Sequence, residues 1–89
     1  MSTLPQRPPG FVYRSSQPPQ LFCDQVALTQ LASRFGTPLY VYSATAIRER
    51  VAAFRSAFRG VDHEISYSVK ANSNLSILRI LAKLGCGFD

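Results

Sequence analysis

The sequence predicts an α/β fold in which helices flank a parallel sheet or barrel. Apolar residues recur at helical spacing in stretches that begin near residues 28, 44 and 75. Short runs of branched and aromatic residues precede or separate these stretches, as is typical of strands. The second half of the chain alternates helix, strand, helix and the start of a strand, an order that favours parallel pairing.

Composition excludes several other classes of protein. The 89 residues are 46% hydrophobic and 17% charged, which is not typical of a disordered tail, a collagen-like repeat or a disulfide scaffold. Cys23 and Cys86 form no spaced ligand set, so no metal site is predicted. Because no apolar run approaches the ~20 residues of a membrane span, and no signal sequence begins the chain, we expect a cytoplasmic protein without membrane contact.

Residues 1–19 are expected to form an extended, loosely held arm. Five of the six prolines lie there. Proline fixes φ and lacks an amide hydrogen, which excludes a helix and disfavours a central strand. A disordered N-terminus is the alternative interpretation.

The next segment, residues 20–43, is expected to contain strand, helix and strand. Residues 20–23 form a possible short strand. The helix has an apolar stripe made of Leu28, Leu31, Ala32 and Phe35. Gly36 suits its C-terminal end, because Pro38 prevents continuation. The aromatic and branched run 39–42 is predicted as a second strand.

A longer amphipathic helix is predicted over residues 44–59, with Ser43 as its N-cap. Its apolar face consists of Ile47, Val51, Phe54 and Phe58. Arginines occupy the other faces and are interpreted as a solvated surface. A nucleic-acid surface is disfavoured, because no aromatic residues interleave with the arginines.

A strand, a helix and the beginning of another strand follow. The first strand is predicted over residues 65–69, ending at Lys70. Residues 72–74 form a turn and cap. The helix over residues 75–84 has one narrow polar stripe, which predicts packing on most of its sides. Residues 87–89 begin the next strand.

Gly85, Cys86 and Gly87 superficially match the start of a dinucleotide-binding loop. The match is weak, because the glycines follow a helix and the third glycine is absent. We interpret Gly85 as the helix cap and Cys86 as a small packing residue.

The predicted fold is incomplete. A buried parallel strand needs neighbours on both sides, and this chain supplies too few. The helix over residues 75–84 also has more apolar surface than one or two strands cover. We therefore expect a piece of a longer protein.

Lys70 and Asp89 are the main candidates for chemistry. Each follows a predicted strand, at the end where a (β/α) barrel places its catalytic groups. Partial desolvation there would lower the pKa of the Lys70 amine and make it a nucleophile toward a carbonyl. A carboxylate at Asp89 could hydrogen-bond a lysine or a cofactor. The alternative for both is a solvated loop residue.

Three sequence blocks, in the same order, resemble the diaminopimelate decarboxylases. These are pyridoxal-phosphate enzymes of the alanine-racemase-like barrel group. The blocks are FGTPLYVYS (35–43), YSVKAN (67–72) and LGCGFD (84–89). The resemblance covers about residues 20–89, and the first block favours this family over ornithine or arginine decarboxylases. Ser68 and Cys86 depart modestly from the family pattern, which usually has alanine and a small residue there.

The resemblance implies the first part of a (β/α)8 TIM-type barrel, preceded by a segment of a β-rich domain. The implied division is a proline-rich arm (1–19), a segment of the β-rich domain (20–43) and the start of the pyridoxal-phosphate-binding barrel (44–89).

The resemblance also implies a cofactor and a reaction. Lys70 would hold pyridoxal 5′-phosphate as a Schiff base, and Asp89 would lie near the cofactor. Ala71 and Asn72 would shape the turn around its ring. The full-length homodimer would convert meso-2,6-diaminopimelate to L-lysine and CO2 in lysine biosynthesis, whereas the 89 residues alone would be inactive.

Two alternatives stay open at this point. One is a related barrel decarboxylase or racemase that acts on another amino acid. The other is a non-catalytic binding module, because the net charge of +5 could serve an acidic partner such as nucleic acid.

Overall fold

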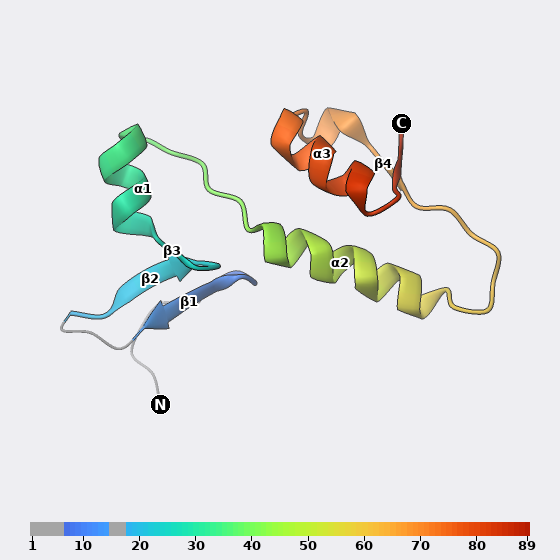
Figure 1. Ribbon diagram of the computed structural model, residues 1–89, viewed down its shortest axis with the longest axis horizontal. Coiled ribbons are helices and arrows are strands. Elements are labelled where there is room, and N and C mark those ends of the chain that lie inside the picture. Colours follow the sequence, from blue (N-terminus) through green and yellow to red (C-terminus); the bar gives the residue numbers. More distant parts are fainter. Residues whose placement is uncertain (1–6, 15–17) are drawn as a thin grey trace. The chain divides into compact units, whose positions relative to one another are not determined.

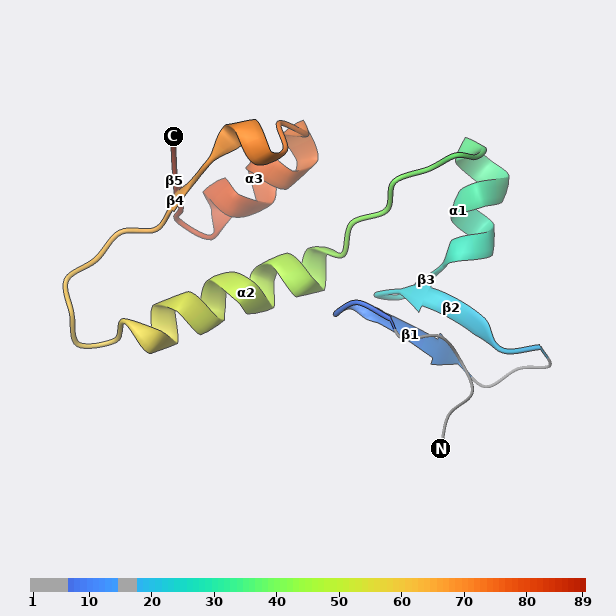
Figure 2. The same cartoon turned by 180° about the vertical axis from the view of Figure 1, so that it is seen from behind.

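The computed structural model describes residues 7–14 and 18–89, so the predicted arm lies partly outside the described residues. The chain forms two compact units, Met1–Ser43 and Ala44–Asp89. Their elements are shown in Figure 1 and, from behind, in Figure 2. No helix within the described ranges is long and apolar enough to cross a membrane.

The first unit contains a three-stranded antiparallel sheet in the order β1-β2-β3. The strands are β1 (Phe11–Arg14), β2 (Gln20–Cys23) and β3 (Val26–Ala27). The prediction for β2 is confirmed. The prediction of a loosely held arm is wrong at β1, which pairs along its whole length with β2. Residues 11–14 contain no proline and β1 is an edge strand, so the flanking prolines do not block its pairing.

Asp24 makes the turn between β2 and β3 in the left-handed conformation, with φ of 54°. A short polar side chain is among the few that tolerate this region. The backbone amide of Asp24 donates to the carbonyl of Gly10 over 2.9 Å. The hydroxyl of Ser43, which is only 5% exposed, donates to Asp24 Oδ1 over 2.6 Å.

Helix α1 (Leu28–Phe35) has the predicted bounds, and Gly36 ends it with φ of 80°. The predicted strand over residues 39–42 is wrong, because this run is irregular. No strand pairs with it among the described residues, and Tyr40 is 88% exposed. Aromatic and branched residues favour strands chiefly by packing on neighbours, which this run lacks here.

The second unit begins with α2 (Ala44–Ala57). Strand β4 (Ser66–Tyr67), the single 3₁₀ turn η1 (Val69–Ala71), α3 (Leu75–Lys83) and β5 (Gly87–Phe88) follow. Strands β4 and β5 pair in parallel, with α3 as the crossover between them. The predicted parallel arrangement is therefore confirmed for these two strands, and the arginines of α2 are exposed as predicted.

The first of these strands is shorter than predicted. Residues 65–69 were expected to be extended up to Lys70, but only Ser66–Tyr67 forms β4. Lys70 instead lies within η1. The paired length is limited by β5, which offers two residues in register.

The core of the second unit lies between α2, α3 and the parallel strands. Its buried members are Val51, Ile77, Leu81 and Cys86, with Ile47, Ile65, Tyr67 and Leu84 packed against them. Cys86 is thus a packing residue, as predicted. Helix α3 has more apolar surface than the described residues cover, as expected for an incomplete fold, and Leu75 at its start is 67% exposed. Only one face of α3 meets the core.

Candidate functional site

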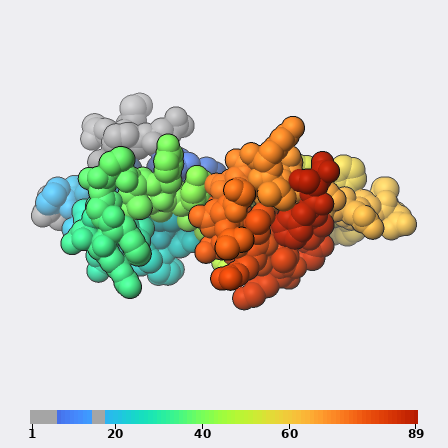
Figure 3. Space-filling view, turned by 90° about the horizontal axis from the view of Figure 1, so that it is seen from above, coloured from blue at the N-terminus to red at the C-terminus, as the bar shows by residue number. Residues whose placement is uncertain are grey.

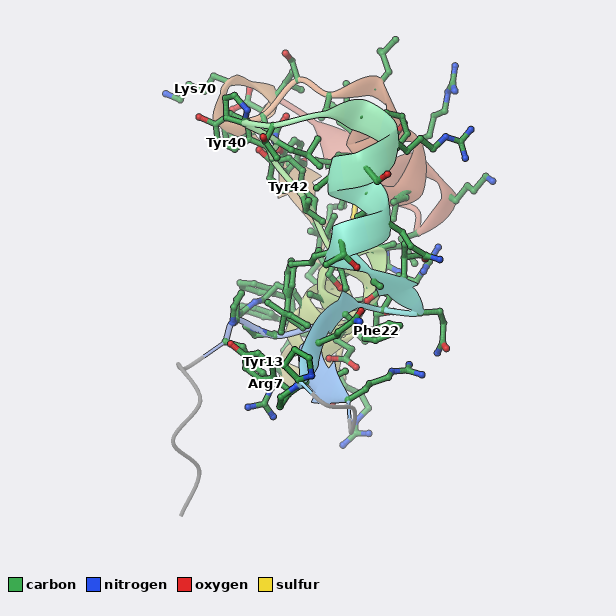
Figure 4. The ribbon with its side chains drawn as sticks, turned by 90° about the vertical axis from the view of Figure 1, so that its left-hand side faces the viewer. Arg7, Tyr13, Phe22, Tyr40, Tyr42 and Lys70 are labelled. Carbon is green, nitrogen blue, oxygen red and sulfur yellow. The ribbon has the colours of Figure 1, made fainter. Side chains whose placement is uncertain are left out.

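Lys70 is placed by the short turn that follows β4. Its side chain is solvent-exposed and projects away from the ribbon (Figure 4). The desolvation expected from the sequence is therefore not present in the described residues. The amine is accessible to a molecule that approaches from solvent.

Backbone hydrogen bonds close the turn around Lys70. The amide of Ala71 donates to the carbonyl of Ser68 over 3.1 Å, and the amide of Asn72 donates to the carbonyl of Val69 over 3.2 Å. These bonds fix the φ and ψ angles on both sides of Lys70. The lysine stands on a defined backbone, while its long side chain stays free to rotate.

Asp89 is brought beside this turn by the parallel pairing. Its amide donates to the carbonyl of Tyr67 over 2.8 Å, and its carbonyl accepts from the amide of Val69 over 2.9 Å. The segment with Lys70 (orange) and the segment after α3 (red) lie side by side at the surface in Figure 3. The structure thus brings together the two residues that the sequence analysis selected, although 19 positions separate Lys70 from Asp89 in the chain.

Asn72 connects this turn to α3. Its Oδ1 accepts from the amide of Asn74 over 3.0 Å. The Oδ1 of Asn74 in turn accepts from the amides of Ser76 and Ile77, which are otherwise unpaired at the start of a helix. The predicted turn and cap are confirmed. The side-chain oxygen of Asn72 is used for this local structure, and Ala71 presents only a methyl group.

Tyr67 belongs to the site, but the sequence analysis gave it no role. Its hydroxyl donates to the backbone carbonyl of Asn72 over 2.9 Å, across the turn that holds Lys70. A half-buried tyrosine usually finds a partner for its hydroxyl, which is the one signal that could have pointed to it. The partner is a backbone atom, so no residue type in the sequence identifies it.

One further feature lies apart from this turn. An open groove of about 280 Å³ between α2 and α3 is lined by Arg48, Ser76, Arg79, Ile80, Lys83 and Leu84. None of the predicted site residues lines it. Within residues 7–14 and 18–89, no group of three His, Cys, Asp or Glu side chains lies close enough together to hold a metal ion.

Residues 44–89 match a family model described as the pyridoxal-dependent decarboxylases, pyridoxal-binding domain. Diaminopimelate decarboxylases are among the similar proteins. The one from Pseudomonas aeruginosa is 48% identical over 79 residues, which is 89% of this chain and 18% of the relative. The one from Aquifex aeolicus is 45% identical over all 89 residues, which is 20% of the relative. The chain therefore spans about a fifth of the length of these curated relatives.

Two solved structures share the fold of this chain. A crystal structure of a protein from Aquifex aeolicus aligns with a TM-score of 0.78 and 47% identity, covering 91% of this chain and 19% of the other. Diaminopimelate decarboxylase from M. jannaschii, solved with L-lysine, aligns with a TM-score of 0.77 and 37% identity over the same shares. At these identities, the two proteins resemble this chain in sequence as well as in fold.

Proposed function

Since this chain belongs to the family of pyridoxal-dependent decarboxylases, we propose that it forms part of a diaminopimelate decarboxylase that holds pyridoxal 5′-phosphate on Lys70. The relatives that share about half of its residues carry this name, and one structural neighbour was solved with L-lysine. The proposed substrate is meso-2,6-diaminopimelate, and the products are L-lysine and CO2.

One observation carries the proposal. Within the matched region 44–89, an exposed primary amine stands on the turn that follows β4, and this turn is bonded to Asp89 at the end of β5. An aldehyde needs an accessible amine to bind covalently, and Lys70 offers it. A carboxylate, Asp89, ends the neighbouring strand at the same edge. The groups present therefore fit the aldehyde end of the cofactor.

The proposed roles follow from this placement. When bound, pyridoxal phosphate supplies an electron sink for the charge left when CO2 departs. Lys70 Nζ would hold the cofactor at its aldehyde carbon, and the same amine would carry a proton at that atom. Asp89 contributes negative charge beside the Lys70 turn. Asn72 and Ala71 hold the turn and leave its outer surface small enough for a ring to approach.

The wider architecture is part of the same proposal. Residues 44–89 would supply the first strand–helix–strand unit of a (β/α)8 barrel, consistent with the parallel pair β4–β5. Residues 20–43 would belong with a β-rich domain and residues 1–19 with its proline-rich arm. We further propose that the full-length protein is a cytoplasmic homodimer that does not contact nucleic acid. This part of the proposal rests on the family resemblance alone. The family membership argues against a purely binding module.

The proposal is tested on the gene product that carries this chain, at its natural length. The protein is incubated with pyridoxal phosphate, reduced with borohydride and mapped by peptide mass spectrometry. We expect the label on Lys70 and its loss in Lys70→Arg. Lys83→Arg is the matched control, because Lys83 is an exposed lysine of α3 outside the turn.

Turnover of diaminopimelate, ornithine and arginine is measured in parallel. We expect diaminopimelate to be preferred and Lys70→Arg to lower kcat at least about a hundredfold, the scale of a lost proton-transfer group. Label at another lysine would contradict the assignment of Lys70. Preference for ornithine or arginine would favour a related decarboxylase.

A further inference from the structure

The hydroxyl of Tyr67 forms a hydrogen bond across the turn that contains Lys70. It donates to the carbonyl of Asn72 over 2.9 Å, five residues further along. Lys70 lies between these two residues, in η1. The bond therefore connects the residue before the turn to the residue after it. It adds to the 3₁₀ hydrogen bonds that the backbone of the turn makes by itself.

The ring of Tyr67 is held on the other side by the core. It packs against the cluster of Val51, Ile77, Leu81 and Cys86. The backbone carbonyl of Tyr67 also accepts from the amide of Asp89 over 2.8 Å. Tyr67 thus ties the turn to the core through its side chain and to β5 through its backbone.

We propose that Tyr67 is a positioning residue for Lys70, whose hydroxyl fixes the turn so that the lysine amine meets the cofactor aldehyde in a constant orientation. This inference rests on the proposed function of Lys70. Tyr67 itself is not expected to touch the cofactor, since its hydroxyl is occupied by Asn72.

The physical reason is that a fixed backbone restricts the positions that the end of a long side chain can reach, whereas a mobile backbone does not. Lys70 is exposed, and no hydrogen bond or ion pair within the described ranges restrains its amine. The backbone therefore sets only the direction of the Cα–Cβ bond, from which the side chain rotates, and so sets the region of space that Nζ samples. Loss of the Tyr67 bond would widen the range of orientations that Nζ samples and lower the fraction suited to attack.

The test measures covalent capture of the cofactor by Lys70 separately from non-covalent binding of the cofactor. Tyr67→Phe keeps the ring in the core and removes only the hydroxyl. The rate of covalent capture of pyridoxal phosphate at Lys70 is measured by borohydride quenching, at saturating cofactor, in the gene product at natural length. The Kd of pyridoxine phosphate, which has an alcohol in place of the aldehyde, measures binding without capture. Thermal unfolding reports the folded fraction.

We expect capture in Tyr67→Phe to be slower by about fivefold, the factor for one lost neutral hydrogen bond, with the Kd of pyridoxine phosphate unchanged. The matched control is Tyr40→Phe, the same change at a side chain that is 88% exposed, and it should alter neither quantity.

Three outcomes would overturn the inference. Capture in Tyr67→Phe at the wild-type rate would show that the hydroxyl does not position Lys70. An equal loss in capture rate and in pyridoxine phosphate affinity would show a structural role only. Failure of the wild type to be labelled at Lys70 would overturn the proposed function as well, and so is distinguishable from the other two.

Discussion

The fold alters the titration of Cys23. It lies in β2 and is 5% exposed. Burial raises the pKa of its thiol, and the negative charge of Asp24 next to it adds a smaller effect in the same direction. The folded state therefore retains the thiol proton at a pH where the unfolded chain has released it.

We expect this difference to make stability depend on pH in the alkaline range. The contribution is fully present below roughly pH 8.5, the ordinary pKa of a cysteine. It is lost as the pH rises through the higher folded pKa, because the unfolded state then binds fewer protons. Tm is measured across this range for the wild type and for Cys23→Ala. A decline of the same steepness in both proteins would contradict the prediction.

The helices, whose sequence pattern involves only neighbouring residues, agreed well with their predictions. Helix α1 begins and ends where the apolar stripe and Gly36 indicate, and α2 ends two residues before the predicted end. Helix periodicity and caps depend on residues within one or two turns, which are adjacent in the sequence. A single chain segment therefore contains most of the information that fixes a helix.

Strands were predicted less well, because a strand is defined by its partner. Residues 39–42 have a strand-like composition but lack a partner, and β4 is limited to the two residues that β5 can pair. Strand β1 lies between proline-rich flanks and forms because β2 is available beside it. The composition of a run shows its preference and says nothing about what lies next to it in space.

Asn74 offers a direct test at the level of one element. Its Oδ1 accepts from two amides at the start of α3. Asn74→Ala should lower the free energy of unfolding by about 1 kcal/mol, the usual value of an N-cap. Chemical denaturation measures the change.

Two variants control this experiment. Asn74→Asp keeps an acceptor in the same place and should restore most of the stability. Ser73→Ala changes an exposed neighbour outside the helix and should have little effect. A loss in Ser73→Ala equal to that in Asn74→Ala would argue against the cap as the cause.

Across the whole molecule, the candidate site was predicted in part. The sequence analysis selected Lys70 and its neighbours from one block and Asp89 from the next strand, and the parallel pairing brings their backbones together. The partial desolvation expected for Lys70 is absent in the described residues, where its side chain is exposed. The sequence could not decide this point, because desolvation depends on what surrounds the amine in space. The role inferred for Tyr67 depends on a bond to a backbone carbonyl, which no sequence pattern discloses.

The 89 residues alone are expected to be inactive. They span about a fifth of the length of the related decarboxylases. Large apolar side chains are also exposed, with Leu75 at 67% and Phe88 at 45%. The isolated chain should therefore bind a hydrophobic dye and show no turnover of diaminopimelate. Measurable release of CO2 by the purified 89-residue chain would refute this.

The bond between the amide of Val69 and the carbonyl of Asp89 also orders events during synthesis. A ribosome makes Lys70 first, yet the turn beneath it gains this bond only after α3 and residues 87–89 have emerged. Until then, we expect the Val69 amide to exchange its hydrogen with solvent as fast as in an unstructured peptide. The exchange rate of the Val69 amide is compared between a chain that stops at Gly85 and the longer protein. Faster exchange in the shorter chain would show that the turn beneath Lys70 is fixed only late in translation.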